Sequence, residues 1–351
     1  MQGDPTTRAG TTRPAAVTRR GLLQIGGGLI LAGAAAPLAA CGGDSGSSAS
    51  GGSGPYSGKQ AIGHYRNVLA GGAPMAIATA KGYFEDEKLD LETIDTPGGS
   101  GTVQVIMQTT HLGMPSTIAG IIAYSKGIQD LRLVSGIFNA ASTYFIAPAD
   151  SPVTADGLRG KKIGTSDPNS ITTYFGNLLA SKKGLTPGKD VEIVYVGEPP
   201  NAWTAVKKGV VDVAWSVPPY GTKLVESEEA KVVVSARDLN PAFADNTLWA
   251  TQGFLEDNGD VVKRWLRAVG RAIALIHDDL EQAASLYATT VNLEPAVARS
   301  ALREYRDAFT LEISREGIQA NIDAARSMKQ LGGDVSVDDV VDDGYLPTEA
   351  T

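Results

Sequence analysis

The spacing of apolar residues predicts a chain in which strands and helices alternate. Residues 59–65, 89–96 and 111–114 are short or alternating apolar runs typical of strands, whereas residues 75–81, 102–109 and 117–126 have helical spacing. The same order recurs over residues 161–165, 171–183, 191–196, 202–208 and 210–215. Because strands separated by helices favour mostly parallel sheets, we expect two α/β units with matching internal order.

Proline and glycine mark the ends of several predicted helices. Pro74 is expected to open the first helix and Gly82 to end it, and Gly184 and Gly209 end two later ones. From Leu255 onward the pattern is helical almost throughout, with amphipathic stretches at residues 261–277, 281–289, 295–309 and 315–331. We expect this late helical block to pack on the first α/β unit.

The first 41 residues have the features of an export signal. Arg19 and Arg20 precede a weakly apolar run, which ends in Leu-Ala-Ala-Cys at residues 38–41. This pattern predicts a signal peptide over residues 1–40, with twin-arginine export and lipidation of Cys41. The alternative of a transmembrane anchor is disfavoured by the many glycines, Pro37 and Gln24 of the run. Leu22 and Gln24 depart from the twin-arginine pattern, so the general export route stays open.

Composition divides the rest of the chain into a tether and a body. Residues 41–58 are mainly Gly, Ser, Asp and Pro, which cannot bury enough surface to fold, so we expect a flexible tether. Cys41 is the only cysteine, and the body therefore has no disulfide. Residues 334–351 carry Asp338, Asp339, Asp342 and Asp343 and are expected to form an acidic, solvated tail.

The charge of the chain excludes some partners. It has 31 Lys and Arg against 39 Asp and Glu, a net charge of −8. Loss of residues 1–40 would remove four Arg and one Asp and bring the charge to −11. Such a body is not suited to coat nucleic acid or anionic lipid. A small anion is not excluded, because backbone amides can make a cleft locally positive.

No catalytic or metal-binding motif is visible. The chain lacks G-x-S-x-G, C-x-x-C, H-E-x-x-H and the P-loop, and His64, His111 and His277 lie far apart in the sequence. We therefore expect a protein that is not an enzyme and needs neither a cofactor nor a metal.

Two turns that precede predicted helices are candidate anion sites. Gly98-Gly99-Ser100-Gly101 follows a strand, and the amides of residues 99–102 with the Ser100 and Thr102 hydroxyls would suit an anionic or carbonyl group. A plain flexible turn is the alternative. Residues 166–170 form a second such turn, with Ser170 as the expected cap of the helix that starts at Ile171. Arg66, beside Asn67, is either an anion clamp or an ordinary surface arginine.

Four segments behind the Leu-Ala-Ala-Cys sequence resemble the periplasmic substrate-binding lipoproteins of nitrate, sulfonate, taurine and thiamine-precursor ABC importers. They are residues 80–92 (AKGYFEDEKLDLE), 158–164 (LRGKKIG), 206–214 (VKKGVVDVA) and 262–268 (VKRWLRA). The resemblance implies an α/β, two-lobed type II periplasmic-binding-protein (Venus-flytrap) fold with the C-terminal helices packed on lobe one. Lobe one would contain residues 59–147 and 240–333, and lobe two residues 148–239.

The same resemblance implies which residues line a cleft between the lobes. Where the family has a small-Gly-x-x-Asp-x-Gly stretch, this chain has Thr109–Gly113 with His111, so the local loop is expected to differ. Together with the two turns and Arg66, the implied ligand-binding set is Arg66, Asn67, Gly99, Ser100, Thr102, Ser116, Thr117, Asn139, Ser142, Ser166, Asn169, Ser170, Ile171, Trp215 and Tyr220.

The resemblance implies a lipid-anchored receptor on the extracytoplasmic face of the cell membrane. It would capture a small organic anion or a heteroaromatic precursor, act as a monomer, and serve an ABC permease and ATPase. Two alternatives stay open: a pyrimidine-precursor biosynthetic enzyme on the same fold, and a sensory or adhesion lipoprotein. The enzymes carry a cysteine-rich, His-containing site, and this chain has only Cys41.

The Leu-Ala-Ala-Cys sequence makes a testable prediction about anchoring. Cys41→Ser removes the thiol that would carry the acyl chains, so we expect the protein either to move to the soluble fraction or to retain its signal peptide. Cell fractionation with intact-mass measurement distinguishes these results. A cleaved variant that stays in the membrane would contradict lipidation, and unchanged ligand affinity of the purified body is the control.

Overall fold

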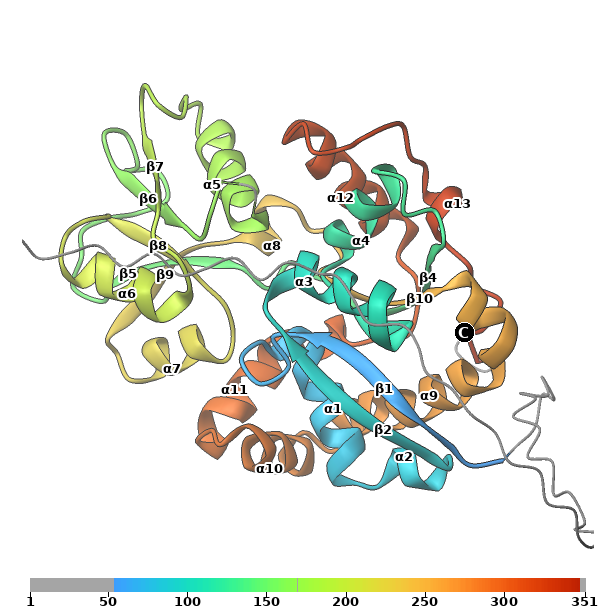
Figure 1. Ribbon diagram of the computed structural model, residues 1–351. Coiled ribbons are helices and arrows are strands. Elements are labelled where there is room, and N and C mark those ends of the chain that lie inside the picture. The colour runs from blue at the N-terminus through green and yellow to red at the C-terminus, as the bar shows by residue number, and fades with distance from the viewer. Residues whose placement is uncertain (1–53, 169, 348–351) are drawn as a thin grey trace, which may run out of the picture. The chain divides into compact units, whose positions relative to one another are not determined.

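A computed structural model of the 351-residue chain describes residues 54–168 and 170–347. Its first sheet has the strand order β2-β1-β3-β10-β4 (Figure 1). β1 is parallel to both β2 and β3, whereas β10 is antiparallel to β3 and β4. The strands are β1 (Tyr56–Gly63), β2 (Leu89–Thr96), β3 (Leu112–Met114), β4 (Leu131–Phe138) and β10 (Asn246–Thr251). We call this sheet and the helices packed on it lobe one.

The second sheet repeats this plan and defines lobe two, with the order β7-β6-β8-β5-β9. β6 is parallel to β7 and β8, and β5 is antiparallel to β8 and β9. Its strands are β5 (Tyr144–Pro148), β6 (Lys162–Thr165), β7 (Glu192–Tyr195), β8 (Val213–Ser216) and β9 (Ala230–Ser235). The two α/β units predicted from the sequence are thus confirmed, each with an antiparallel strand inserted where the chain crosses between lobes.

The helices of lobe one come from both ends of the described chain. They are α1 (Leu69–Ala80), α2 (Tyr83–Asp86), α3 (Gly98–Val105), the π-helix η1 (Ile106–Thr110), α4 (Thr117–Ser125), α9 (Gln252–Asp278), α10 (Leu280–Val291), α11 (Pro295–Tyr305), the short 3-10 helix η2 (Arg306–Ala308), α12 (Arg315–Ser327) and α13 (Val337–Val340). α9 and α10 pack on α1, and α12 packs on α4 (Figure 1). The expected packing of the late helices on lobe one is therefore confirmed.

The amphipathic pattern of α9 explains how that helix is held against the first sheet. Trp265 is fully buried, and its indole N–H donates to Gln60 Oε1 on β1 at 2.7 Å. Phe84 packs against the same indole, with ring centroids 6.3 Å apart. Burial of an indole with its N–H satisfied is worth several kcal/mol, about 3–5 on truncation to alanine, so α9 is a permanent part of lobe one.

Lobe two has a smaller set of helices around a core that continues into Ile118 of α4 and Ala324 and Ala325 of α12. They are α5 (Ile171–Lys182), α6 (Pro199–Lys207), α7 (Tyr220–Glu226) and α8 (Ala236–Leu239). Phe145 on β5 and Phe175 on α5 are buried, and Phe175 packs edge-on against Phe243 at a centroid distance of 5.1 Å. The chain crosses from lobe one to lobe two through residues 139–143 and returns through residues 236–245.

Several boundaries differ from those expected. The first strand begins at Tyr56, so the last three residues of the expected tether belong to β1, while its earlier part and residues 1–40 lie outside the described residues. α1 begins at Leu69 and not at Pro74, because the Leu69 N–H is already satisfied by the Pro218 carbonyl at 3.1 Å. The end of lobe one expected at residue 147 falls earlier, because Tyr144–Pro148 pairs within the second sheet.

The acidic C-terminal segment is not a free tail over its described part. Val340 is fully buried, and Val335 is buried in the same apolar cluster, beneath β4. The Asp342 N–H donates to the Leu133 carbonyl at 2.8 Å, which extends the edge of the sheet. Ser336 and Asp339 form a capping box on α13. Asp338 and Asp339 therefore lie in the first turn of a docked helix. Among the described residues, no helix has both the length and the hydropathy needed to span a membrane.

Neighbouring glycines of α1 give a prediction with a built-in control. A Cβ on Gly72 would overlap the Tyr65 carbonyl oxygen, whereas a Cβ on Gly71 meets only ordinary contacts, the nearest being Asn246 Nδ2 at 3.5 Å. We expect Gly72→Ala to lower the free energy of unfolding by about 1–3 kcal/mol, and Gly71→Ala to raise it by roughly 0.5–1 kcal/mol through helix propensity. Urea unfolding measures both. Equal effects of the two substitutions would contradict the close contact between α1 and the turn that contains Tyr65.

Candidate functional site

The N-termini of α3 and α4 lie side by side in lobe one. A Cβ on Gly99 would overlap Ser116 Oγ and the Ala119 side chain, so only glycine lets the two helix starts approach this closely. Neither start has a side-chain cap, because Pro97 precedes α3 and the Ser116 hydroxyl makes no cap hydrogen bond. The first amides of α3 therefore keep their donors for another group, which is the usual basis of an anion site.

The turn between β1 and α1 lies against the start of α3. His64 accepts at its carbonyl oxygen from the Asn67 and Val68 amides, and its ring Nε2 lies 3.6 Å from a Cβ built on Gly98. The Tyr65 amide donates to Asp95 Oδ1 at 2.9 Å, which ties the turn to the end of β2. The turn leaves Arg66 and Asn67 exposed, and Arg66 forms no ion pair within residues 54–168 and 170–347. Arg66 is thus an exposed cation on the turn whose His64 ring lies against the α3 start.

The start of α5 carries the corresponding turn in lobe two. Ser170 caps the helix as predicted, since its Oγ accepts from the Thr173 amide at 3.2 Å. Its hydroxyl lies 2.9 Å from the Asp167 carbonyl, to which it can donate, and 2.8 Å from Thr172 Oγ1, which in turn accepts from the Ser166 amide. The Ser170 side chain is therefore committed to the turn. Donors for a ligand at this end come from the amides at Ile171 and Thr172, and Asn169 lies outside the described residues.

Three of the expected ligand-binding hydroxyls face the protein interior. Thr102 is fully buried and bonds to Thr96 Oγ1 at 2.7 Å and to the Gly98 carbonyl at 2.8 Å. Thr117 is also fully buried, with its hydroxyl 3.1 Å from Thr247 Oγ1. Ser142 is buried and bonds to Asp245. Because each hydroxyl already has partners inside the lobe, these three residues shape the site from behind and we do not propose them as ligand contacts.

The remaining expected residues also have specific neighbours. The Trp215 indole N–H donates to the Gly197 carbonyl at 2.8 Å, which holds the ring against the β7–α6 loop with 8% of its surface exposed. Tyr220 is the half-buried first residue of α7, and burial raises the pKa of its hydroxyl. The side-chain amide of Asn139 is already used, because it donates to the Glu312 carbonyl at 3.0 Å.

Contacts between the lobes occur at places that sequence reasoning did not identify. The bond from Leu69 to the Pro218 carbonyl joins the β1–α1 turn to the β8–α7 turn. On another flank, Arg237 contacts Glu304 at 3.5 Å and lies over the Tyr305 ring, 4.5 Å from its centroid. Burial raises the pKa of the Glu304 carboxyl, and the Arg237 charge opposes that rise. No motif marks these residues in the sequence, because each pair is far apart along the chain.

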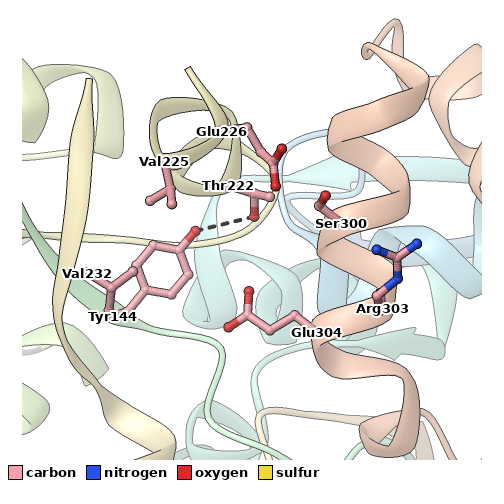
Figure 2. Close-up of a pocket in the computed structure, with 8 residues that line it drawn as sticks. All are labelled: Tyr144, Thr222, Val225, Glu226, Val232, Ser300, Arg303 and Glu304. Carbon is pink, nitrogen blue, oxygen red and sulfur yellow. Dashed lines mark hydrogen bonds between the residues drawn. The ribbon is translucent and has the colours of Figure 1, made fainter. Parts of the chain in front are cut away.

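A pocket of about 270 Å³ opens beside this flank, between α7, β9 and α11 (Figure 2). The Tyr144 hydroxyl lies 3.5 Å from Thr222 Oγ1, a long contact, and burial raises the pKa of that hydroxyl. Glu304 points toward the Tyr144 ring in Figure 2. The lining is mixed in polarity and includes none of the expected ligand-binding residues: Tyr144, Thr222, Val225, Glu226, Val232, Ser300, Arg303 and Glu304.

A second hollow, of about 330 Å³, lies between α3 and α4 and includes one expected residue, Ser100. Its floor is apolar, with Met107 and Ile122 among the lining residues, and its rim carries Lys126. The described residues contain no group of three or more His, Cys, Asp or Glu placed to hold a metal ion.

Asp245 joins several parts of lobe one to the crossing segments. Its side-chain oxygen accepts from the Ser142 amide at 3.2 Å and from the Ser142 hydroxyl, and its carbonyl accepts from the Thr117 amide at 2.8 Å. Burial raises the pKa of the Asp245 carboxyl, and the two Ser142 hydrogen bonds limit the rise. Sequence reasoning missed this residue, because an isolated aspartate carries no pattern.

Comparison with known proteins assigns the family. Residues 71–283, more than half of the chain, match the family model described as NMT1/THI5 like. The chain belongs to the NMT1/THI5-like family. A curated relative, a putative aliphatic sulfonates-binding protein of Bacillus subtilis, is 26% identical over 287 residues, which cover 78% of this chain and 84% of that protein.

Two further comparisons concern the fold and the functions of similar proteins. The periplasmic aliphatic sulphonate binding protein SsuA of Escherichia coli superposes with a TM-score of 0.70 at 20% identity, over 84% of this chain and 95% of that structure. The fold is therefore the two-lobed periplasmic-binding-protein fold that the sequence predicted. The 4-amino-5-hydroxymethyl-2-methylpyrimidine phosphate synthase of Candida albicans is 24% identical over 221 residues, 57% of this chain and 61% of that enzyme. Proteins similar to this chain thus include a putative binding protein and an enzyme.

The raised pKa of Asp245 predicts a pH dependence of stability. Above about pH 4, where an unfolded aspartate ionises, the folded protein binds more protons at this site than the unfolded chain does. The free energy of unfolding therefore falls as the pH rises through the folded pKa. Asp245→Asn removes this dependence, so its stability relative to wild type should increase with pH over that window and then level off.

Urea unfolding over a pH series measures the difference. Ser135→Ala is the matched control, because it removes another buried hydrogen-bonding group of lobe one, bonded to the Gly136 and Leu311 carbonyls, without a titrating group. It should shift the stability by the same amount at each pH. A constant offset for Asp245→Asn as well would contradict the raised pKa.

Proposed function

We propose that this protein is the extracytoplasmic solute-binding component of an ABC importer and captures a small organic anion or heteroaromatic precursor between its lobes. The observation that carries the proposal is the pair of helix starts without side-chain caps at Gly98 and Thr117, with Arg66, which has no ion pair among residues 54–168 and 170–347, on the neighbouring turn. Helix N-termini and a guanidinium can stabilise the negative charge of a ligand through hydrogen bonds alone.

The relatives narrow the substrate class. Aliphatic sulfonates, named for the Bacillus subtilis relative, present three oxygens to hydrogen-bond donors and an alkyl chain to apolar walls. The amides at the α3 start can serve the oxygens, and the start of α5 offers matching donors from lobe two. We infer that sulfonates or similarly shaped anions are the first candidates, with nitrate, taurine and thiamine-type pyrimidines as the others.

The proposal includes the partner subunits of the importer and the location of the protein at the membrane. A permease and an ATPase would receive the solute, and lipidation at Cys41 would keep a monomeric receptor at the extracytoplasmic membrane face. Two chain crossings join the lobes within the described chain, and this connection supports a mechanism in which one lobe rotates against the other on binding.

The second candidate function is pyrimidine-precursor synthesis, which the Candida albicans relative favours. Two features of this chain weigh against it. The described residues contain no cysteine, and their three histidines have separate neighbours. His277 bonds to the Phe309 carbonyl at 3.0 Å, His64 lies beside Gly98, and His111 is an exposed residue after η1. A catalytic site would need these groups to converge.

A ligand screen tests the proposed function. Nitrate, taurine, butane-1-sulfonate and 4-amino-5-hydroxymethyl-2-methylpyrimidine are added to the purified protein, and thermal unfolding is followed. A true ligand at 100 times its Kd should stabilise the fold by about 2.7 kcal/mol. Recovery of the ligand from the protein in chemically unchanged form shows that the protein binds it and does not convert it. No stabilisation by any small anion or pyrimidine would contradict the proposal.

Arg66→Ala tests where the anion binds. A hydrogen bond to a charged group is worth about 1.5–3 kcal/mol, so we expect butane-1-sulfonate affinity to fall roughly 10–150 fold. Isothermal titration measures the change. Arg299→Ala is the matched control, because this half-exposed arginine lies on α11, where it pairs with Glu281. Equal affinities of wild type, Arg66→Ala and Arg299→Ala would remove Arg66 from the site while leaving solute binding itself intact.

A further inference from the structure

We propose that Asp245 is a positioning residue that couples the start of α4 to the hinge between the lobes. The proposal rests on the proposed function, because a coupling of this kind has a purpose only if a ligand at the helix start must drive closure. Asp245 stands at the last position of the returning crossing segment, directly before β10.

Four hydrogen bonds make Asp245 the meeting point of separate elements. Its N–H donates to the Phe138 carbonyl at the end of β4, at 2.9 Å. Its carbonyl accepts from Thr117, the first residue of α4, at 2.8 Å. Its carboxylate accepts both donors of Ser142, the amide at 3.2 Å and the hydroxyl. One residue thus holds a helix start, a strand end and the opposite crossing segment.

The two crossing segments are joined at both of their ends. At the lobe-two end the Ala236 amide donates to the Thr143 carbonyl at 2.9 Å, and the adjoining strands β5 and β9 pair directly. The lobe-one end is joined by backbone as well, because β4 and β10 pair directly and the Asp245 amide donates to the Phe138 carbonyl. Between these two ends, the Asp245 carboxylate adds a side-chain link to Ser142 of the other crossing segment. Backbone pairing within a sheet is rigid, whereas a side-chain contact can be broken and re-formed, so the Asp245 carboxylate is an adjustable link between the two crossing segments.

This arrangement connects ligand binding to hinge geometry in a short path. A ligand at the uncapped α4 start would pull on the same helix turn whose Thr117 amide is held by Asp245. Any shift of Asp245 moves its carboxylate relative to Ser142 in the crossing segment. A hinge needs such a two-state element if a local ligand contact is to bias domain closure.

The packing around the returning segment limits where this motion can occur. The Ala244 carbonyl accepts from the Asn321 side chain of α12 at 2.8 Å, and Gly317 of the same helix lies against Ala242. Ala242 and Ala244 are therefore held against lobe one, whereas the Phe243 ring between them packs on Phe175 of lobe two. Because the returning segment touches both lobes, we expect bending of the hinge to change the contact between Asp245 and Ser142 of the first crossing segment.

Hydrogen exchange followed by mass spectrometry tests the coupling in the full-length chain without any ligand. Asp245→Ala leaves the Ser142 amide without its acceptor, and we expect exchange over residues 139–143 to accelerate roughly tenfold. Coupling further predicts faster exchange over residues 116–120, although the backbone bond from Thr117 is not removed. Asp245→Asn keeps an acceptor oxygen and should restore both segments to nearly wild-type rates.

The controls separate coupling from a general loss of stability. Ser135→Ala removes a buried hydroxyl of β4 that bonds to the Gly136 and Leu311 carbonyls, and it should leave residues 116–120 unchanged. Ser142→Ala removes only the hydroxyl donor and serves if Asp245→Ala does not fold; it should act in the same direction with a smaller effect. Wild-type exchange at residues 116–120 in the folded Asp245→Ala or Ser142→Ala protein would overturn the proposal.

Binding of butane-1-sulfonate then distinguishes this proposal from the proposed function. If the coupling and the proposed function both hold, Asp245→Ala weakens binding roughly tenfold, whereas Asp245→Asn and Ser135→Ala bind nearly as wild type does. Small-angle scattering then shows less compaction for Asp245→Ala than for wild type at saturating ligand. If wild type and every variant bind none of the screened solutes, the proposed function fails, while the exchange result still decides the coupling. Normal affinity and normal compaction in Asp245→Ala would overturn the coupling alone.

Discussion

The constraint on which the candidate site depends is the parallel direction of the central strands. Because β1, β2 and β3 run the same way, α1, α3 and α4 all start at one edge of the first sheet. Each helix start leaves amide donors without intrahelical partners. In lobe two, β6 and the start of α5 repeat the arrangement. An acidic chain can therefore present positive potential at this edge, because the donors are backbone groups that the surface composition does not alter.

Close approach of these helix starts depends on small residues. Gly99 faces Ser116 and Ala119, and Gly63 faces the Thr102 hydroxyl, so a larger side chain at either glycine would separate α3 from its neighbours. The buried hydroxyls of Thr96 and Thr102 satisfy each other behind the turn and hold its first residues in place. Rigid support of this kind lets the exposed amides act as preorganised donors, which reduces the entropic cost of binding.

The sequence predicted the order of strands and helices because both lobes have strong apolar periodicity and glycine stops. It predicted the Ser170 cap for the same local reason. Where long-range contacts decided the outcome, it failed: Pro74 did not open α1, since Pro218 fixes an earlier start, and the acidic C-terminal segment packs under β4 through Val335 and Val340. Isolated apolar residues give no periodic signal in the sequence. Val335 and Val340 nevertheless bury enough surface to hold the C-terminal segment against lobe one.

The candidate site shows the same division between local and long-range information. Turns rich in Gly and Ser identified the α3 and α5 starts, but residue type alone could not show that the Thr102, Thr117 and Ser142 hydroxyls point inward. Asp245 and Ser142 are separated by 103 positions, so only the return of the chain through the second crossing brings them together. Loops and helix starts can be found from composition, whereas the connections that join the two lobes arise only from the topology. The hinge is consequently the part of this molecule for which the structure adds most to the sequence.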